Sequence, residues 1–129
     1  GEGIRGSKKK TIYDRGQYII MKEIRWAGSS YKDLCNFPVA ARHEAGYQLY
    51  LVQCGLEPTD WKPMSGIGTG VREIRLHQGG EHRVIYMAKR EEAIYVLHTF
   101  EKRTQRTPKR EIELAKTRLI EIKVQRRRQ

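Results

Sequence analysis

Apolar and polar residues alternate in three short runs in the second half of the chain. Residues 71–77, 82–89 and 93–100 repeat with the two-residue period of a β-strand. Gly79-Gly80 and residues 90–92 separate the runs with turn-forming residues. The pattern predicts a meander of three antiparallel strands.

Apolar residues recur at helical spacing on both sides of this meander. In the helix before it, which Pro38 opens and Gly55 ends, they are Ala41, Ala45, Leu49 and Val52. In the helix after it, which begins at Thr107-Pro108, they are Ile112, Ala115, Leu119 and Ile122. Each helix therefore has one face that can pack on a sheet.

The remaining elements precede and join these. Residues 18–26 are typical of a first strand, and residues 30–33 resemble a capping box that starts a short helix through Leu34. Residues 55–70 contain two prolines and several glycines and indicate a long loop, which is often functional in a compact domain.

The order of elements predicts an α+β domain. We expect a small, mostly antiparallel sheet, formed by one N-terminal strand and the meander and covered on one face by helices. The other face should stay at least partly open. The expected divisions are a disordered basic arm over 1–17, one domain over 18–123 and a basic tail over 124–129.

Strand parity assigns side chains to the open face. If Ile74 and Leu76 point to the helices, then Glu73, Arg75 and His77 point away from them. Arg83 falls on the same open face with Ile85 and Met87. In the last strand, where both faces are apolar, we place Tyr95 and Leu97 toward the helices and Val96, His98 and Phe100 opposite.

The net charge of the chain indicates what kind of partner this face binds. The 129 residues include 26 Lys and Arg against 15 Asp and Glu, a formal net charge of +11. Such an excess favours an anionic partner, namely nucleic acid, an acidic protein or a membrane surface, although it also serves solubility. No apolar run approaches the roughly 18 residues of a membrane span.

The residue types exclude several kinds of site. The two cysteines lack CxxC spacing, there is no secretory signal, and reduced thiols in the cytoplasm are expected. The four histidines lack zinc-ligand spacing with either cysteine, and no acidic cluster suits Mg²⁺. We therefore expect no metal and no small-molecule cofactor.

Five segments carry a family resemblance: WAGSSYKDL, FPVAARHEAGYQLYLVQCG, DWKP, GVREIRLHQGGEHRVIYMA and YVLHTFEKRTQRTP. They resemble the RelE/ParE superfamily of toxins from bacterial toxin–antitoxin pairs, specifically its phage-derived, HigB-like branch. The resemblance covers Met21 to Leu119 and implies a RelE-like fold. It also implies a ribosome-dependent mRNA endonuclease and a small antitoxin partner, commonly a helix-turn-helix protein.

The resemblance carries over to basic residues of the strands. Arg75, Arg83 and Arg103 correspond to the family's catalytic cations, with Lys102 beside them. After Tyr95 the chain has no Tyr, whereas many RelE-type enzymes place one near the C-terminus. ParE-like relatives share the fold but inhibit gyrase, so a gyrase-inhibiting toxin and a non-catalytic RNA- or protein-binding module remain alternatives.

Metal-independent RNA cleavage assigns roles to these residues. A base takes the 2′-hydroxyl proton and cations stabilise the charged phosphorane. His98 or Glu73 is the expected base, and His is better matched to neutral pH. The expected catalytic residues are Glu73, Arg75, Arg83, His98 and Arg103. The expected RNA contacts are Trp61, Lys62, Arg72, Phe100, Lys102 and Arg106.

Each assignment has a structural alternative. Arg75 and Arg83 could instead pair with Glu73 across the hairpin. His98 could be a hydrogen-bonded core residue, and Lys102 with Arg103 could be a solvated pair of charges.

Overall fold

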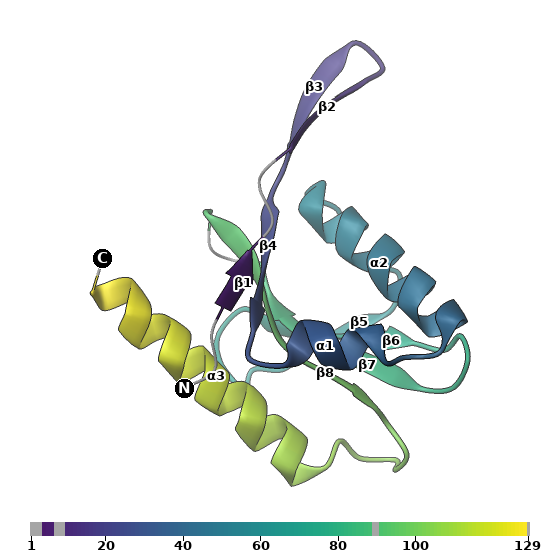
Figure 1. Ribbon diagram of the computed structural model, residues 1–129, viewed down its shortest axis with the longest axis vertical. Helices are drawn as coiled ribbons and strands as arrows, with labels where there is room; N and C mark the ends of the chain where they lie inside the picture. The colour runs from purple at the N-terminus through teal and green to yellow at the C-terminus, as the bar shows by residue number, and fades with distance from the viewer. Residues whose placement is uncertain (1–3, 7–9, 89–90, 129) are drawn as a thin grey trace.

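A six-stranded sheet lies at the centre of the chain, between helices (Figure 1). The computed structural model describes residues 4–6, 10–88 and 91–128. The strands of this sheet follow the order β1-β4-β8-β7-β6-β5. Their bounds are β1 Ile4–Gly6, β4 Glu23–Ala27, β5 Trp61–Pro63, β6 Val71–Leu76, β7 His82–Met87 and β8 Ala93–Glu101. All pairs in the sheet are antiparallel except β4 with β8, which is parallel.

Strand β7 is the centre of the hydrophobic core. All six of its residues are buried, because β6 and β8 pair with its two edges and side chains cover both of its faces. Val84 and Tyr86 belong to one apolar cluster, while Ile85 and Met87 belong to another. The predicted parity of this strand is confirmed.

Helices cover both faces of the sheet. Helices α1 (Ser30–Cys35) and α2 (Val39–Gln53) pack on the side of Val84 and Tyr86. Helix α3 (Lys109–Arg127) packs on the opposite side, and Figure 1 shows α2 and α3 flanking the sheet. The α+β class and the helix-covered sheet are confirmed. The expectation that the helices share one face is corrected for α3, because Ile67, Val71 and Ile85 give its apolar stripe a surface to bury.

A β-bulge changes parity within β8. Ile85 pairs with His98 but Tyr86 pairs with Val96, so Leu97 is an extra residue on the β8 side. As a result Val96 lies with the α2 cluster, whereas His98 and Phe100 lie on the Arg83 face. Our placements of Tyr95, Val96 and Leu97 are wrong, because Tyr95 and Leu97 lie in the α3 cluster and Val96 does not. Those of His98 and Phe100 are confirmed.

The segment expected to be a disordered arm contains strands. Besides β1, strands β2 (Lys10–Asp14) and β3 (Gln17–Met21) form a separate two-stranded hairpin, which projects from the sheet in Figure 1. Arg15 and Gly16 both adopt positive φ, at 50° and 82°, as a tight hairpin turn of the primed type requires. The β-branched and aromatic residues 11–13, which pair with residues 18–20 of the predicted first strand, were the missed signal. Residues 1–3 and 7–9 of the expected arm lie outside the described residues.

Three further expectations about the helices and strands are corrected. The first expected strand, 18–26, divides at Lys22 between β3 and β4. The capping box is not formed: Ser30 is buried inside α1, and its hydroxyl donates to the carbonyl of Val96 (Oγ–O 3.3 Å). Helix α3 continues through Arg127, so most of the expected tail is helical.

The loop between α2 and β6 packs closely against α3. It contains β5 and then approaches the helix at Gly68, where a Cβ atom would lie 2.5 Å from Leu119 Cδ2. Only glycine fits this approach without displacement. Among the described helices, none is long and apolar enough to cross a membrane.

Truncating α3 on its buried side should destabilise the fold. Leu119 is 2% exposed, and Leu119→Ala should lower the free energy of unfolding by about 2–5 kcal/mol, because it leaves a cavity between α3 and the sheet. The adjacent Ile120 is 61% exposed, so Ile120→Ala is a matched control that should change stability by less than about 0.5 kcal/mol. Urea unfolding measures both, and equal losses would contradict the packing of α3 on this face.

Candidate functional site

Four cations converge on the face of the sheet that α3 partly covers. We call Lys62, Arg75, Arg83 and Lys102 the cation cluster. Strand register gathers three of them: Lys62 pairs with Glu73, and Arg75 pairs directly with Arg83. Lys102 follows β8, where its backbone N–H donates to the Glu81 carbonyl (2.8 Å). Two arginines directly opposite each other repel, so this arrangement favours an anion between them.

Glu73 is the counter-charge beneath this cluster. Its side chain is fully buried, and its Oε1 lies 3.7 Å from Arg83 Nε and 3.8 Å from Lys62 Nζ. The hydroxyl of Thr107 donates to Oε2 at 3.2 Å. Among the described residues, Glu73 Oε1 and Arg83 Nε have no hydrogen-bond partner. Glu73 Oε1 therefore interacts with Lys62 and Arg83 Nε through charge rather than through direct hydrogen bonds.

Three residues that parity did not select as catalytic orient the arginines. His77 bridges Asp60 Oδ2 and Glu81 Oε2, each at 2.7 Å. Asp60 Oδ1 lies 3.6 Å from Arg75 Nη1, and Glu81 Oε1 accepts a 2.9 Å hydrogen bond from Arg83 Nη2. Its hydrogen bonds to Asp60 and Glu81 raise the pKa of His77. The spacing of His77 and Glu81 at the β6–β7 turn was the only sequence signal for this bridge.

Lys102 has an altered acidity. Burial lowers the pKa of its ammonium, and the positive charges of Arg83, Lys62 and Arg75 add to that effect. A lysine of this kind releases its proton more readily than an exposed one. The cavity beside it, of about 350 Å³, is lined by Glu81, Arg83, Lys102, Arg103, Thr104 and Gln105.

His98, the expected base, is bound within the core. Arg118 Nη1 donates to its Nδ1 (3.1 Å), and because arginine has no acceptor, Nδ1 must carry the lone pair. Nε2 then carries the hydrogen and donates to Glu111 Oε2 (3.1 Å). Burial lowers the pKa of this imidazole, which is 5% exposed. Since both ring nitrogens are occupied, the structural alternative describes His98 better.

The other expected residues are dispersed. Phe100 is buried, stacks on His98 (5.1 Å between centroids) and pairs with Arg83 across the strands. Arg103 and Arg106 are exposed; Arg103 lines the cavity beside Lys102 and pairs with Glu101 (2.6 Å). Trp61 and Arg72 lie on the opposite face of the sheet, where the Arg72 guanidinium stacks over the indole at 3.9 Å.

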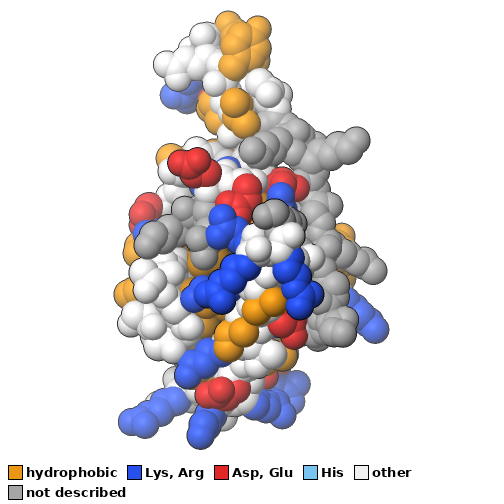
Figure 2. Space-filling model, turned by 90° about the vertical axis from the view of Figure 1, so that its left-hand side faces the viewer, with side chains coloured by type: hydrophobic (Ala, Val, Ile, Leu, Met, Phe, Trp, Pro, Cys, Tyr) orange, Lys and Arg blue, Asp and Glu red, His pale blue; other side chains and the backbone are white. Residues whose placement is uncertain are grey.

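Lys and Arg side chains are spread over the α3 side of the molecule. Figure 2 shows them surrounding an apolar strip, with smaller acidic patches between them. From Glu101 to the end of the chain there are 11 Lys and Arg against 4 Glu, which is more than half of the net charge. This surface can attract a polyanion toward the cation cluster.

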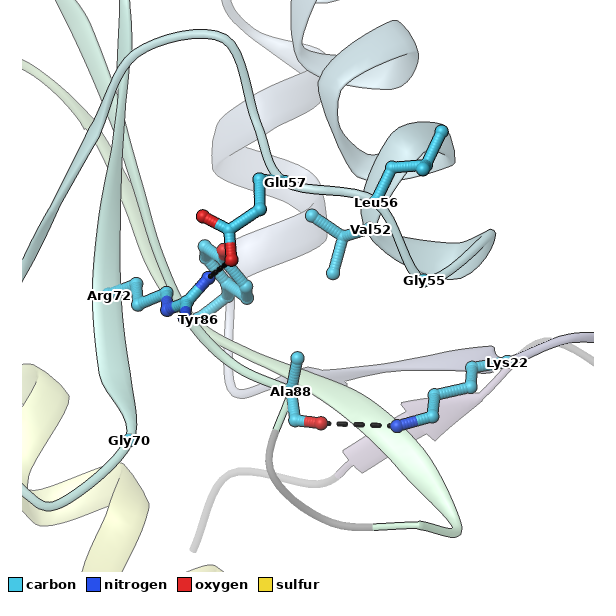
Figure 3. A pocket seen from close by; sticks show the side chains of 9 residues that line it. All are labelled: Lys22, Val52, Gly55, Leu56, Glu57, Gly70, Arg72, Tyr86 and Ala88. Atoms are coloured by element: carbon cyan, nitrogen blue, oxygen red, sulfur yellow. Dashed lines mark hydrogen bonds and ion pairs between the residues drawn. The ribbon is translucent and has the colours of Figure 1, made fainter.

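A second cavity, of about 420 Å³, lies on the other side of the sheet (Figure 3). It is lined in part by Val52, Leu56, Glu57 and Arg72, and the Lys22 ammonium donates to the Ala88 carbonyl (3.2 Å) at its edge. Arg72 Nη1 pairs with Glu57 at 3.3 Å across its mouth. It is therefore remote from the cation cluster. No group of three or more His, Cys, Asp or Glu side chains in the described residues is arranged to hold a metal ion.

The His77 bridge should make stability depend on pH. Its folded pKa is raised, so its contribution is fully present below the unfolded pKa of about 6.5 and is lost as pH rises through the folded value. His77→Asn should remove this part of the pH dependence of unfolding above neutrality. His43→Asn, at an exposed histidine on α2, should leave it unchanged, and identical profiles for the His77 variant and the wild type would refute the bridge.

Comparison with known proteins identifies the family. The model of the phage-derived Gp49-like protein family (DUF891) matches residues 32–120, which include α2, the meander and the whole cation cluster. No curated protein and no solved structure matches the chain. The family is RelE-like and is associated with the toxins of toxin–antitoxin pairs. The chain therefore belongs to the phage-derived Gp49-like family of toxin-like proteins.

Proposed function

We propose that this chain is the toxin of a type II toxin–antitoxin pair, of the HigB-like kind, which cleaves mRNA on the ribosome in the cytoplasm. The observation that carries the proposal is the convergence of four cations around one buried carboxylate, Glu73. An antitoxin partner accompanies membership of a toxin family, and we expect it to be a helix-turn-helix protein.

The cleavage needs no metal in this proposal. The 2′-oxygen attacks the adjacent phosphorus, an O2′–P bond forms and the P–O5′ bond breaks. The products are a 2′,3′-cyclic phosphate and a 5′-hydroxyl. Arg75 and Arg83 bind the phosphate oxygens and stabilise the added negative charge, since a guanidinium presents two parallel donors and stays charged.

Lys102 takes the place of His98 as the base. Its amine receives the 2′-hydroxyl proton, for which its lowered pKa suits it. In-line attack puts base and acid on opposite sides of phosphorus, and the strand order puts Lys62 on β5 and Lys102 after β8, on the two sides of Arg83 on β7. We assign the ammonium of Lys62 to protonate the leaving 5′-oxygen. Glu73 keeps these cations in place.

Removing an arginine of the cluster should abolish cleavage. Arg75→Ala should lower the rate of mRNA cleavage at translating ribosomes by about 10²–10³-fold, because it removes a donor to the phosphorane. Arg75 is partly exposed, so the variant should fold, and Arg127→Ala at the exposed end of α3 is the matched control. Mapping of mRNA 5′ ends after induction measures both. Growth arrest with intact messages and damaged DNA would favour gyrase inhibition instead.

Lys102 should set the pH dependence of cleavage. In Lys102→Arg the charge remains but the guanidinium does not release its proton at neutral pH, so binding of RNA should persist while the cleavage rate falls. Lys102→Ala should lose both in part. Single-turnover cleavage on purified ribosomes between pH 6 and 9 tests this. An unchanged pH profile for Lys102→Arg would remove Lys102 from the role of base.

A further inference from the structure

A third cavity, of about 350 Å³, lies beside the cation cluster at the free edge of β8. We call it the edge pocket. Strand β4 pairs with β8 only as far as Val96, so the last residues of β8 have no strand on that side in the described chain. Residues from α1, the α1–α2 connection, β7, β8 and the start of α3 form its walls. Among them are Asp33, Phe37, His82, Phe100, Glu101 and Glu111.

The lining differs in charge from the rest of this basic protein. Three carboxylates, from Asp33, Glu101 and Glu111, face a cavity that has no Lys or Arg among its lining residues. Phosphate is repelled there, whereas a group that offers N–H donors is attracted. Two aromatic rings, Phe37 and Phe100, supply flat apolar surface. These are the features by which proteins hold an unstacked base of single-stranded RNA.

The buried side chain of His82 indicates that the edge pocket holds a ligand. The side chain is 1% exposed and lies against Phe37, with 4.4 Å between ring centroids. Neither of its ring nitrogens has a hydrogen-bond partner among the described residues, and Nε2 lies 3.7 Å from Glu101 Oε2. Buried polar groups are normally paired, so an unpaired imidazole in a pocket wall indicates a missing group.

The neighbouring cluster decides which ligand fits. Phe100 is the cross-strand partner of Arg83, so a wall of the edge pocket directly adjoins a phosphate-binding cation. A nucleotide can place its phosphate on the cluster and its base over the β8 edge. A neutral imidazole offers one donor and one acceptor, which a base can match and an arginine side chain of a protein partner, having donors only, cannot.

We propose that the edge pocket is a nucleobase site that prefers guanine. The proposal rests on the function proposed above, because the cluster supplies the phosphate contact. Guanine presents adjacent N1–H and N2–H donors, and one carboxylate can accept both. Uracil presents a single N–H between two carbonyl oxygens, which the carboxylates repel. Glu101 is the main acceptor in this arrangement, because it is the exposed one of the three carboxylates and its Oε2 lies 3.7 Å from His82 Nε2. Its Oε1 also accepts a hydrogen bond from Arg103 (2.6 Å), so that oxygen is shared.

Titration of nucleoside monophosphates into the purified full chain, followed by NMR amide shifts, tests the site. GMP should bind about tenfold more tightly than UMP, in line with one good bidentate base contact. Ribose 5-phosphate should bind weakly and measures the phosphate contact alone. Glu101→Gln should remove most of the GMP preference and leave ribose 5-phosphate binding unchanged. Glu113→Gln, an equal loss of charge on the exposed face of α3, should change neither.

The outcomes separate the two proposals. If all four nucleotides bind only as well as ribose 5-phosphate, the base site is overturned and the phosphate site stands. If ribose 5-phosphate and the nucleotides all fail to bind, the proposed function loses its basis as well. If N-acetyl-arginine amide shifts the edge-pocket residues and GMP does not, the pocket belongs to a basic protein partner and the base site is overturned. Phe100→Leu, which keeps the core apolar, should also weaken GMP relative to ribose 5-phosphate.

Discussion

Burial of the Glu73 carboxylate is the constraint on which the rest of the site depends. A buried carboxylate is unfavourable unless opposite charges and hydrogen-bond donors surround it. Lys62, Arg83 and Thr107 supply these from β5, β7 and the start of α3. The same contacts fix where α3 begins relative to the sheet. A single internal charge therefore links the position of the last helix to the direction of the cations.

The two arginines of the cation cluster differ in how firmly their side chains are held. Arg83 is held by Glu73 beneath it and by Glu81 beside it, and its side chain is almost fully buried. Arg75 is one-third exposed and touches Asp60 only at 3.6 Å. The Arg83 guanidinium is thus fixed before any ligand arrives, whereas the Arg75 guanidinium can move toward the ligand. This division suits a site that must admit a flexible chain and then close on one phosphate.

Sequence reasoning recovered the fold better than the site. The period-two runs and the helical stripes were enough to place β6, β7, β8, α2 and α3, because apolar residues recur in each at the spacing of its element. The side of the sheet that α3 covers depended on long-range packing of Ile67 and Val71, which no local pattern encodes. The first strand of the N-terminal hairpin was missed because the surrounding glycines and lysines concealed the short β-forming run of residues 11–13.

Within the site, residue type predicted which side chains come together, but the sequence did not predict which of them are accessible. Arg75 and Arg83 come together as their parity suggested, and Lys62 and Lys102, which were selected for their charge, join them. His98 has the right chemistry and the right face, but Arg118, twenty residues later in the chain, occupies its acceptor nitrogen. Trp61 lies on β5, which was expected to be loop, so its parity was not considered. Arg72 lies on β6, where the alternation that directs Glu73 and Arg75 to the cationic face directs it to the opposite face.

The β-bulge at Leu97 determines the electrostatic sign of one corner of the site. With the bulge, His98 and Phe100 alternate onto the cationic face and Lys102 continues that series. In a regular strand the series would be residues 97, 99 and 101, and the corner would carry the carboxylate of Glu101 where the ammonium of Lys102 now lies. One extra backbone residue therefore reverses the polarity of the surface. The bulge thus keeps a phosphate-attracting group at this end of β8 without altering any charged residue.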